Sequence, residues 1–309
     1  MAIIRPFIGI RPNKGKAADI AALPYDVYNR EEAKKVVAAQ PDSFLRIDRA
    51  ETNFPDTVST YDEAVYDKAK ELLWKAVENG DFIREDKRCY YIYELTMNGR
   101  TQTGIVACAS IDDYKNHVIK EHENTREEKE IDRIRHVDTC SAQTGPIFLA
   151  YRADSKINEV IRQVKTGEAE YDFVSDDGIR HRVFVIAKES QITAIEQAFS
   201  GINEIYIADG HHRAASAVKV ALKRRAENPG FTGEEEFNFF LAVAFRAEEL
   251  KIMDYNRLIK DKNGLSNEEL FMRLREIFEI AEKDGAVKPA RRHTFGFYCN
   301  KKWYELTLK

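Results

Sequence analysis

The sequence has few cysteines, no long apolar run and little net charge. Its four cysteines, at positions 89, 108, 140 and 299, form no CxxC pair, so neither a structural zinc site nor a disulfide framework is expected. No run approaches the ~18 apolar residues of a membrane-spanning helix, and the first residues lack the apolar segment of a signal peptide. We therefore expect a cytoplasmic protein that contacts no membrane.

Two common catalytic motifs are also absent. The chain contains no GxxxxGK[ST] loop, which excludes nucleotide binding of the Walker A type. His122-Glu123 begins like the zinc motif HExxH, but Arg126 stands in place of the second histidine. The formal net charge of −4 gives no general attraction to nucleic-acid phosphates. We expect no nucleic-acid partner and no tightly bound transition metal. The sequence does not decide the oligomeric state, and a homo-oligomer is possible.

The order of turns and apolar runs predicts an α+β (mixed α/β) fold, with a mixed sheet and flanking helices. Asn98-Gly99 between two β-branched runs is a strong hairpin signal, and Asn79-Gly80 ends a long amphipathic helical pattern. Because hairpins and helices are interspersed, a doubly wound parallel sheet is not favoured. Strands are expected near 89–96, 103–111, 146–151, 169–175, 181–187, 204–208, 237–246 and 294–308. Helices are expected near 31–39, 59–79, 121–138, 189–199, 210–226 and 266–281.

We expect this chain to form two regions. Residues 1–260 would form the main α/β domain, which carries both of the polar motifs described next. Residues 261–309 contain a helical pattern and a hairpin pattern around Asn300-Lys301. This second region is expected to be the start of a longer one.

The densest polar motif is Asp209-Gly210-His211-His212-Arg213, which follows an apolar strand and opens a helix rich in alanine. A glycine turn at a helix start presents backbone N–H groups and the positive end of the helix dipole to an anion. Arg213 can grip a phosphate with its planar guanidinium. This pattern favours a phosphate site. In the alternative interpretation, Asp209 is only the helix N-cap, and the histidines are ordinary first-turn residues.

A second polar cluster is predicted on the helix over 121–138. Successive residues of a helix are rotated by ~100° about its axis, so histidine, arginine and lysine side chains would line up in one stripe of that helix. Thr125 and Asp132 would lie beside this stripe. A helix this polar either lines a wet cleft or is exposed to solvent. The alternative is a surface helix that is held by i,i+4 pairs such as Asp132 with His136. The stripe contains His122, Arg126, Lys129, Arg133 and His136.

These motifs, taken in order, resemble a bacterial and archaeal family of unknown function that is often labelled ParB-like. The resemblance covers residues 5 to about 260. Members of that family are usually longer, which implies further sequence after Lys309. Whether such a region completes the site stays open. The motifs are Pro6-Phe7 with Arg11-Pro12, Pro24-Tyr25-Asp26-Val27, His122-Glu123-x-Thr125 with Lys129 and Asp132-Arg133, and Ile207-Ala208-Asp209-Gly210-His211-His212-Arg213.

The Asp209–Arg213 turn is also similar to the phosphate-binding turn of the ParB/sulfiredoxin group, whose members bind nucleotides there. Free-serine kinases, which phosphorylate L-serine with ATP or ADP, resemble the same group. The resemblance implies a ParB/sulfiredoxin-like core around the turn and one cleft shared by both polar clusters. It also implies Mg²⁺ with ATP or ADP as the cofactor.

The first functional hypothesis is a nucleotide-dependent phosphotransferase that acts on a small hydroxyl metabolite, such as serine. The alternative is a non-catalytic, nucleotide-sensing ParB-like module, which needs no base. The catalytic candidates are Glu123, Asp26, His122 and Lys129. The phosphate- or nucleotide-binding candidates are Asp209, Gly210, His211, His212, Arg213, Thr125 and Arg133. The candidates for orienting magnesium are Asp209 and Asp132.

Overall fold

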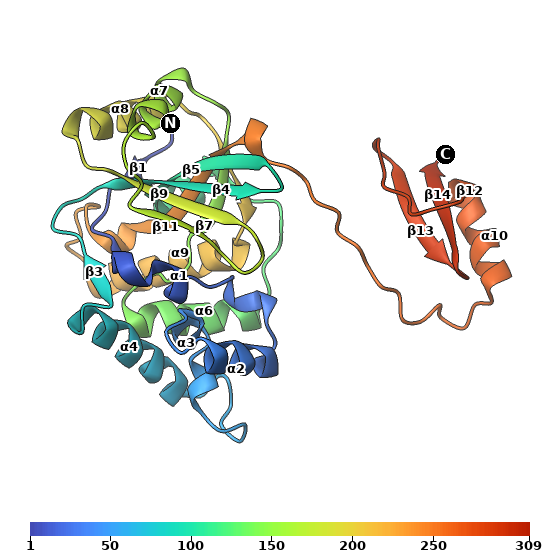
Figure 1. Cartoon of the computed structure of the whole chain (residues 1–309), viewed down its shortest axis with the longest axis horizontal. Helices are drawn as coiled ribbons and strands as arrows, with labels where there is room; N and C mark the ends of the chain where they lie inside the picture. Colours follow the sequence, from blue (N-terminus) through green and yellow to red (C-terminus); the bar gives the residue numbers. More distant parts are fainter. The chain divides into compact units, whose positions relative to one another are not determined.

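Figure 1 shows the computed structural model, which describes all 309 residues. The chain divides into two compact units, Met1–Leu250 and Lys251–Lys309. Residues 251–262 contain no helix or strand, and the boundary that the sequence suggested at 260 lies within this segment. No helix is both long enough and apolar enough to cross a bilayer.

A mixed sheet of nine strands forms the centre of the first unit. β10 runs parallel to β6, and β11 runs parallel to β7, whereas the other neighbours are antiparallel. The α+β fold with a mixed sheet is therefore confirmed. In spatial order the strands are β6 Ile119–Lys120, β10 Ile205–Asp209, β7 Ile147–Tyr151, β11 Phe239–Arg246, β5 Arg100–Ser110, β4 Tyr90–Met97, β9 Arg180–Ile186 and β8 Tyr171–Val174, with β1 Ile4–Arg5 also beside β5.

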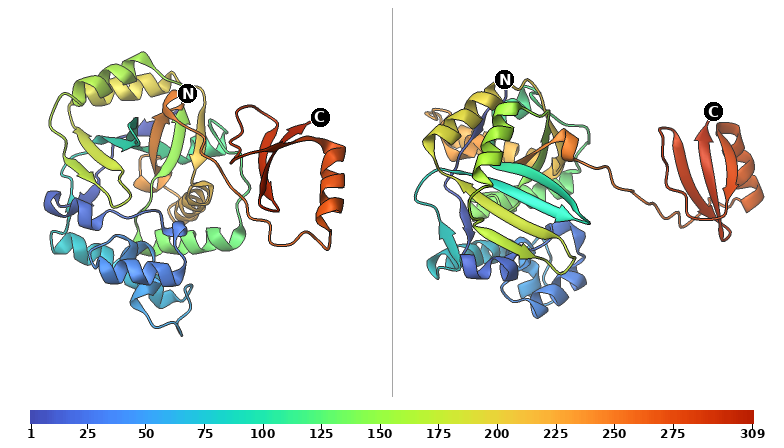
Figure 2. Two further views of the ribbon diagram at one scale, coloured as in Figure 1. Left: turned by 45° about the vertical axis from the view of Figure 1, so that its right-hand side comes forward. Right: turned by 45° about the horizontal axis from the view of Figure 1, so that its top comes forward.

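Helices lie on both sides of this sheet, as Figures 1 and 2 show. α7 and α8 lie on one side, and α9, α6 and α4 lie on the other. A short ribbon of β2 (Ile10–Pro12) and β3 (Phe82–Arg84) stands apart from the main sheet. The helices of this unit are α1 Ala17–Ile20, α2 Arg30–Ala39, α3 Leu45–Asp48, α4 Glu63–Glu78, α5 Ile111–Lys115, α6 Glu127–Cys140, α7 Ser155–Val164, α8 Glu189–Ser200 and α9 His211–Glu227.

Alternation along β11 separates the core of this unit from its hollow side. Phe240 and Ala242 belong to the main hydrophobic cluster. Leu241, Val243 and Phe245 instead line cavities. Successive side chains of a strand point to opposite faces, so β11 turns one row of side chains to the main hydrophobic cluster and the other row to the cavities.

Two parallel β–α units lie side by side at the edge of the sheet. β6 leads to α6 and β10 leads to α9, and Ile119 pairs with Ile205 in the parallel register. Ser216 and Lys219 of α9 contact Glu130 of α6. Because the carboxyl ends of parallel strands meet at the same edge, the polar segments that follow β6 and β10 are brought together.

Two predicted helices differ from those in the structure. The helix predicted from 121 begins at Glu127, since residues 121–126 continue as a loop after β6. Glu127, Glu128 and Glu130 lie in the first turn, where carboxylates favour a helix start. His122, Glu123 and Thr125 are therefore loop residues and not part of a helical stripe. The helix predicted over 266–281 is α10 (Asn267–Ile277), and β12 begins directly at Phe278.

The tight turns agree with the sequence. Asn98 and Gly99 have φ of 52° and 76° and join β4 to β5, which is the left-handed geometry that Asn-Gly hairpins require. Gly178, with φ of 79°, lies in the turn between β8 and β9. The hairpin predicted at Asn98-Gly99 is confirmed.

The second unit is a small sheet accompanied by one helix. Its strand order is β12-β14-β13, and Asn300 and Lys301 form the predicted β13–β14 turn with φ of 53° and 62°. Ser266 and Glu269 form a capping box at the start of α10, which satisfies two free N–H groups of the helix. The strands are β12 Phe278–Lys283, β13 Thr294–Cys299 and β14 Lys302–Leu308.

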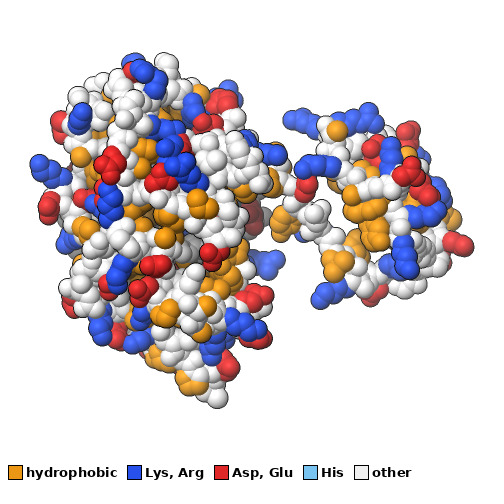
Figure 3. Space-filling model, in the orientation of Figure 1, with side chains coloured by type: hydrophobic (Ala, Val, Ile, Leu, Met, Phe, Trp, Pro, Cys, Tyr) orange, Lys and Arg blue, Asp and Glu red, His pale blue; other side chains and the backbone are white.

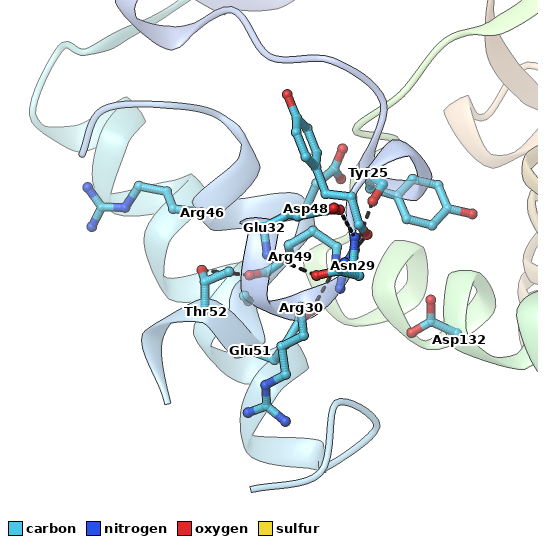
Figure 4. Close-up of polar contacts among 12 residues, drawn as sticks. Tyr25, Asn29, Arg30, Glu32, Arg46, Asp48, Arg49, Glu51, Thr52 and Asp132 are labelled. Carbon is cyan, nitrogen blue, oxygen red and sulfur yellow. Dashed lines mark hydrogen bonds and ion pairs between the residues drawn. The ribbon is translucent and has the colours of Figure 1, made fainter. Parts of the chain in front are cut away.

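The Pro24-Tyr25-Asp26-Val27 segment forms a 3₁₀ turn, and hydrogen bonds from Arg49 hold this turn in place (Figure 4). The Arg49 guanidinium donates to the carbonyls of Tyr25 and Tyr28 and, through Nε, to Glu51 Oε1 at 2.6 Å. Glu51 is only 2% exposed. A buried carboxylate needs such a partner, so this ion pair holds both the Glu51 region and the turn that carries Tyr25 and Asp26.

We predict that Arg49→Ala strongly destabilises the first unit. The change leaves the Glu51 carboxylate buried without its partner, which costs about 3–5 kcal/mol in comparable buried pairs. Urea unfolding followed by circular dichroism measures the loss. Lys35→Ala, which removes one partner of an exposed pair with Glu31, is the control and should leave the midpoint unchanged. Equal midpoints for Arg49→Ala and the wild type would contradict the role of Arg49.

Candidate functional site

The Asp209–Arg213 motif has the strand–turn–helix geometry that the sequence suggested. β10 ends at Asp209, Gly210 has a φ of 93°, and α9 begins at His211. A Cβ on Gly210 would lie 3.1 Å from the Arg213 Nε. Glycine is thus needed both for the left-handed backbone and for the side chain that folds over it.

The start of α9 has no side-chain cap. Gly210, and not Asp209, is the N-cap residue, and no side chain accepts a hydrogen bond from the first turn. The alternative interpretation of Asp209 as the N-cap is therefore wrong. The Asp209 carboxylate instead pairs with Arg213, with Oδ2 at 2.6 Å from an Nη atom. The first N–H groups of a helix have no partner within it, so those of α9 are available to an anion.

His211 and His212 fasten the loop 121–126 to α9. The Nε2 atom of His212 accepts a hydrogen bond from the Arg126 N–H at 3.0 Å, and that of His211 accepts from the His122 N–H at 3.4 Å. An accepting Nε2 means a neutral ring with its proton on Nδ1. Nδ1 of His211 lies 3.6 Å from a Glu123 carboxylate oxygen. Burial and the neighbouring His122 lower the pKa of His211, which agrees with that neutral form.

Arg213 lies at the wall of a cavity of about 340 Å³. Besides Asp209, its guanidinium donates to the Pro146 carbonyl at 2.5 Å. Arg133, from the middle of α6, lines the same cavity. Two guanidinium groups from two helices therefore face one enclosed space, which favours an anionic ligand. The polar groups around the cavity include Tyr25, Asp48, Arg133, His136, Thr144, Asp209 and Arg213.

Arg133 is a buried cation with acidic and aromatic neighbours. Only 7% of Arg133 is exposed, its guanidinium binds Asp132 at 2.8 Å, and it lies over the Tyr25 ring at 4.0 Å. Burial lowers the pKa of Arg133. The nearby carboxylates of Asp132 and Asp48 raise it by a larger amount, so the net shift of the pKa is upward. The side chain stays charged, and Tyr66, which donates to Asp132 at 2.9 Å, holds its partner in place.

His136 was predicted to lie on the polar stripe but was given no role in the site, and Asp48 was not predicted at all. His136 is 3% exposed, and its Nε2 lies 3.3 Å from the Ile47 carbonyl and 3.9 Å from Asp48 Oδ1. Thr144 donates to the same Asp48 oxygen at 2.6 Å. The position of His136 three residues after Arg133 was an available signal, since i and i+3 share a helix face. No pattern in the sequence singled out Asp48.

A second, smaller cavity of about 210 Å³ adjoins the first. Tyr25, Asp48, Arg133 and His136 line both cavities. Of the remaining predicted site residues, the smaller cavity is lined by Asp26, Lys129 and Asp132.

The predicted site residues therefore fall into three groups. Asp209, Arg213 and Arg133 share the larger cavity. The smaller cavity is lined by the second group, which consists of Asp26, Lys129, Asp132 and, again, Arg133. A third group lies at the junction of the loop and α9 and lines neither cavity, and Thr125 donates to Glu130 there. The third group is His122, Glu123, Thr125, Gly210, His211 and His212.

The two candidates for magnesium line different cavities. Asp209 faces the larger one and is bound to Arg213, whereas Asp132 faces the smaller one and is bound to Arg133. No cluster of three or more His, Cys, Asp or Glu side chains is arranged to hold a metal ion. Magnesium commonly uses one or two carboxylates together with substrate phosphates, so either aspartate fits an ion that enters with a nucleotide.

Comparison with known proteins places the chain in a family. The family described as "Protein of unknown function (DUF1015)" matches residues 4–309. The chain belongs to this family. The expected membership in a family of unknown function is thereby confirmed, whereas the match lends no support to a ParB-like relationship. Neither the curated proteins nor the solved structures contain a match to this chain.

We predict that His212→Ala frees one end of the loop 121–126. The amide of Arg126 loses its acceptor and should exchange with solvent about fivefold faster, since a hydrogen bond of this kind contributes ~1 kcal/mol. Hydrogen exchange followed by NMR measures the rate. The amide of His122, which donates to His211, serves as the internal control. An unchanged Arg126 rate would show that His212 does not hold the loop.

We also predict that His136 makes the fold less stable in acid. Burial, followed by Arg133, lowers the pKa of His136, and Asp48 opposes them only in part. The unfolded chain takes up this proton near pH 6.5, and the folded chain takes it up only at lower pH. Stability should therefore fall as the pH drops below about 6.5, and be fully present above it.

The measurement is the urea midpoint between pH 7 and pH 5. The decline should be smaller in His136→Gln than in the wild type. His117→Asn, a change at an exposed histidine with a φ of 56°, is the control and should keep the wild-type decline. The same pH dependence in all three proteins would contradict the assignment to His136.

Proposed function

We propose that this protein binds the phosphates of a nucleotide at the start of α9 and transfers a phosphoryl group to a small hydroxyl metabolite. The observation that carries the proposal is the position of Arg213. This residue follows an uncapped helix start and lines the same cavity as the buried Arg133. Uncapped N–H groups, the helix dipole and two guanidinium groups together suit a di- or triphosphate.

The charges around the cavity also suit phosphoryl transfer. This reaction relies mostly on positioning and on neutralising the charge of the transferred group. Arg133 and Arg213 would supply that charge from two different helices, and Lys129 lines the adjoining cavity. Magnesium, when bound with the nucleotide, would add further positive charge, and Asp209 is the carboxylate in the larger cavity that would contact it.

A distant ParB-like relationship is part of the proposal. Its support is the order of the motifs and the strand–glycine–helix geometry at Asp209–Arg213. Under this proposal the loop 121–126, fastened by His211 and His212, forms the rim of the phosphate site. Since nucleotides and small metabolites are cytoplasmic, we place the protein in the cytoplasm.

The test is phosphorus NMR of the protein with ATP or ADP, magnesium and a pool of small hydroxyl compounds that includes L-serine. A new phosphomonoester signal is expected, and Arg213→Ala should reduce its rate of formation by about 10²–10³-fold, as for the loss of one charge-stabilising donor. Arg162→Ala is the matched control, because Arg162 also pairs with a nearby carboxylate, Glu159, but is exposed and lies outside both cavities.

The outcomes separate the two hypotheses. Loss of the signal in Arg213→Ala, with Arg162→Ala unaffected, supports a phosphotransferase. Nucleotide binding without turnover would replace this proposal with the non-catalytic nucleotide sensor. If the wild type neither binds nor turns over a nucleotide, both the phosphotransferase hypothesis and the nucleotide-sensor hypothesis are wrong.

A further inference from the structure

One histidine that lines the larger cavity carries a buried polar atom without a partner in the protein. Nδ1 of His136 is fully enclosed and makes no hydrogen bond. Native proteins satisfy nearly all of their buried polar atoms, and exceptions often mark a ligand or a reacting group. His136 lines both cavities beside Arg133, and Nδ1 is the ring atom that the protein leaves without a partner.

The protein fixes which form of the ring is present. A carbonyl oxygen can only accept, so the Ile47 carbonyl at 3.3 Å requires a proton on Nε2. The Asp48 carboxylate, 3.9 Å from Nε2, favours the same form. In the neutral ring Nδ1 then carries a lone pair, which is the arrangement of a general base with an orienting carboxylate behind it.

The charged and titratable groups that face this ring come from several elements. Asp48 of α3 and the more distant Asp132 of α6 favour a proton on the ring, whereas Arg133 of α6 and burial oppose it. Tyr25, from the 3₁₀ turn, lines the same cavities. The net effect is a pKa below the ordinary value, so the ring is neutral at pH 7 and able to accept a proton.

We propose that His136 is the general base of this site and accepts, through Nδ1, the proton of the hydroxyl group that becomes phosphorylated. This inference rests on the proposed phosphotransfer. As the hydroxyl oxygen forms its bond to the terminal phosphorus, the bond from that phosphorus to the bridging oxygen breaks, and the leaving nucleotide keeps the electron pair. The proton passes to Nδ1, and Asp48 stabilises the resulting imidazolium.

His136 fits this role better than the two carboxylates that the sequence suggested. The Glu123 side chain is 61% exposed, lies near His211 and lines neither cavity. Asp26 lines only the smaller cavity, away from Arg213 and Asp209. His136 shares the larger cavity with the phosphate-binding candidates and carries the free acceptor.

The decisive variant is His136→Gln, whose amide can still donate to the Ile47 carbonyl but cannot act as a base. Using the pool member that the wild type phosphorylates, we expect kcat to fall by about 10²–10⁴-fold, as for loss of a general base. The Kd for the nucleotide, measured by calorimetry, should stay within about threefold, because the change acts on the transition state. His181→Gln, at another partly buried histidine with a lowered pKa but outside both cavities, is the control.

The pH profile provides a readout that a purely structural role would not move. Since the pKa of His136 is lowered, kcat/KM of the wild type should fall only at a pH below the ordinary histidine value of about 6.5. This fall should be absent in His136→Gln. Asp48 raises the pKa of His136, so Asp48→Asn should shift the fall to lower pH. This second variant decides the matter if His136→Gln does not fold.

Each outcome leads to a clear decision. A wild type without turnover overturns the proposed function, and this inference with it. An active wild type, with His136→Gln within tenfold of its kcat and an unshifted profile in Asp48→Asn, overturns the inference alone.

Discussion

The parallel pairing of β6 with β10 is the contact on which the rest of the candidate site depends. It aligns two strand ends, and from those ends start the loop 121–126 with α6 and the glycine turn with α9. The two helices then run side by side, tied by Glu130 and, further along, by Asp138, which contacts Lys223 and Arg224. Residues about 80 positions apart thus share one cavity wall.

A second constraint brings the amino-terminal region to the same place. The buried Arg49–Glu51 pair holds the turn that carries Tyr25 (Figure 4), and Tyr25 lies against the Arg133 guanidinium. Asp48, one residue before Arg49, accepts from Thr144 and approaches His136. The cavity therefore has walls from three distant parts of the chain, and each wall is held by a buried charge with a partner.

The charges on the face of the molecule drawn in Figure 3 have no comparable focus. Figure 3 shows blue and red side chains interspersed over the visible face, without a large patch of one sign. The formal net charge of −4 agrees with this picture. Under the proposed function, selectivity for an anion would therefore come from the enclosed guanidinium groups, where the low dielectric strengthens each contact, and not from long-range attraction.

Local patterns predicted the local structure well. The hairpin at Asn98-Gly99 and the strand–turn–helix at Asp209–Arg213 depend on residues with special backbone geometry, so they were visible in the sequence. The start of α6 was missed because polar residues continue on both sides of Glu127, and only the carboxylates of its first turn mark the change from loop to helix.

The partners of the site residues were much harder to predict. His211 and His212 looked like ligands for an anion, whereas their rings accept hydrogen bonds from a loop that only the β6–β10 pairing brings near. No pattern in the neighbouring sequence marks Asp48, since its role comes from contacts with Thr144 and His136. Both of these residues lie about 90 positions further along the chain. Tertiary contacts of this kind depend on topology, which a single sequence does not display.

The ion pair between Arg213 and Asp209 has a thermodynamic consequence. The guanidinium that would bind an anion is already occupied by a carboxylate at 2.6 Å. An anion that draws Arg213 away leaves the Asp209 carboxylate without its counter-charge and ready to take up a cation. The uptake of an anion and the uptake of a cation are thus linked, and by reciprocity each raises the affinity for the other. A ligand that brings both charges together would gain from this exchange, whereas a bare anion would have to compete with Asp209.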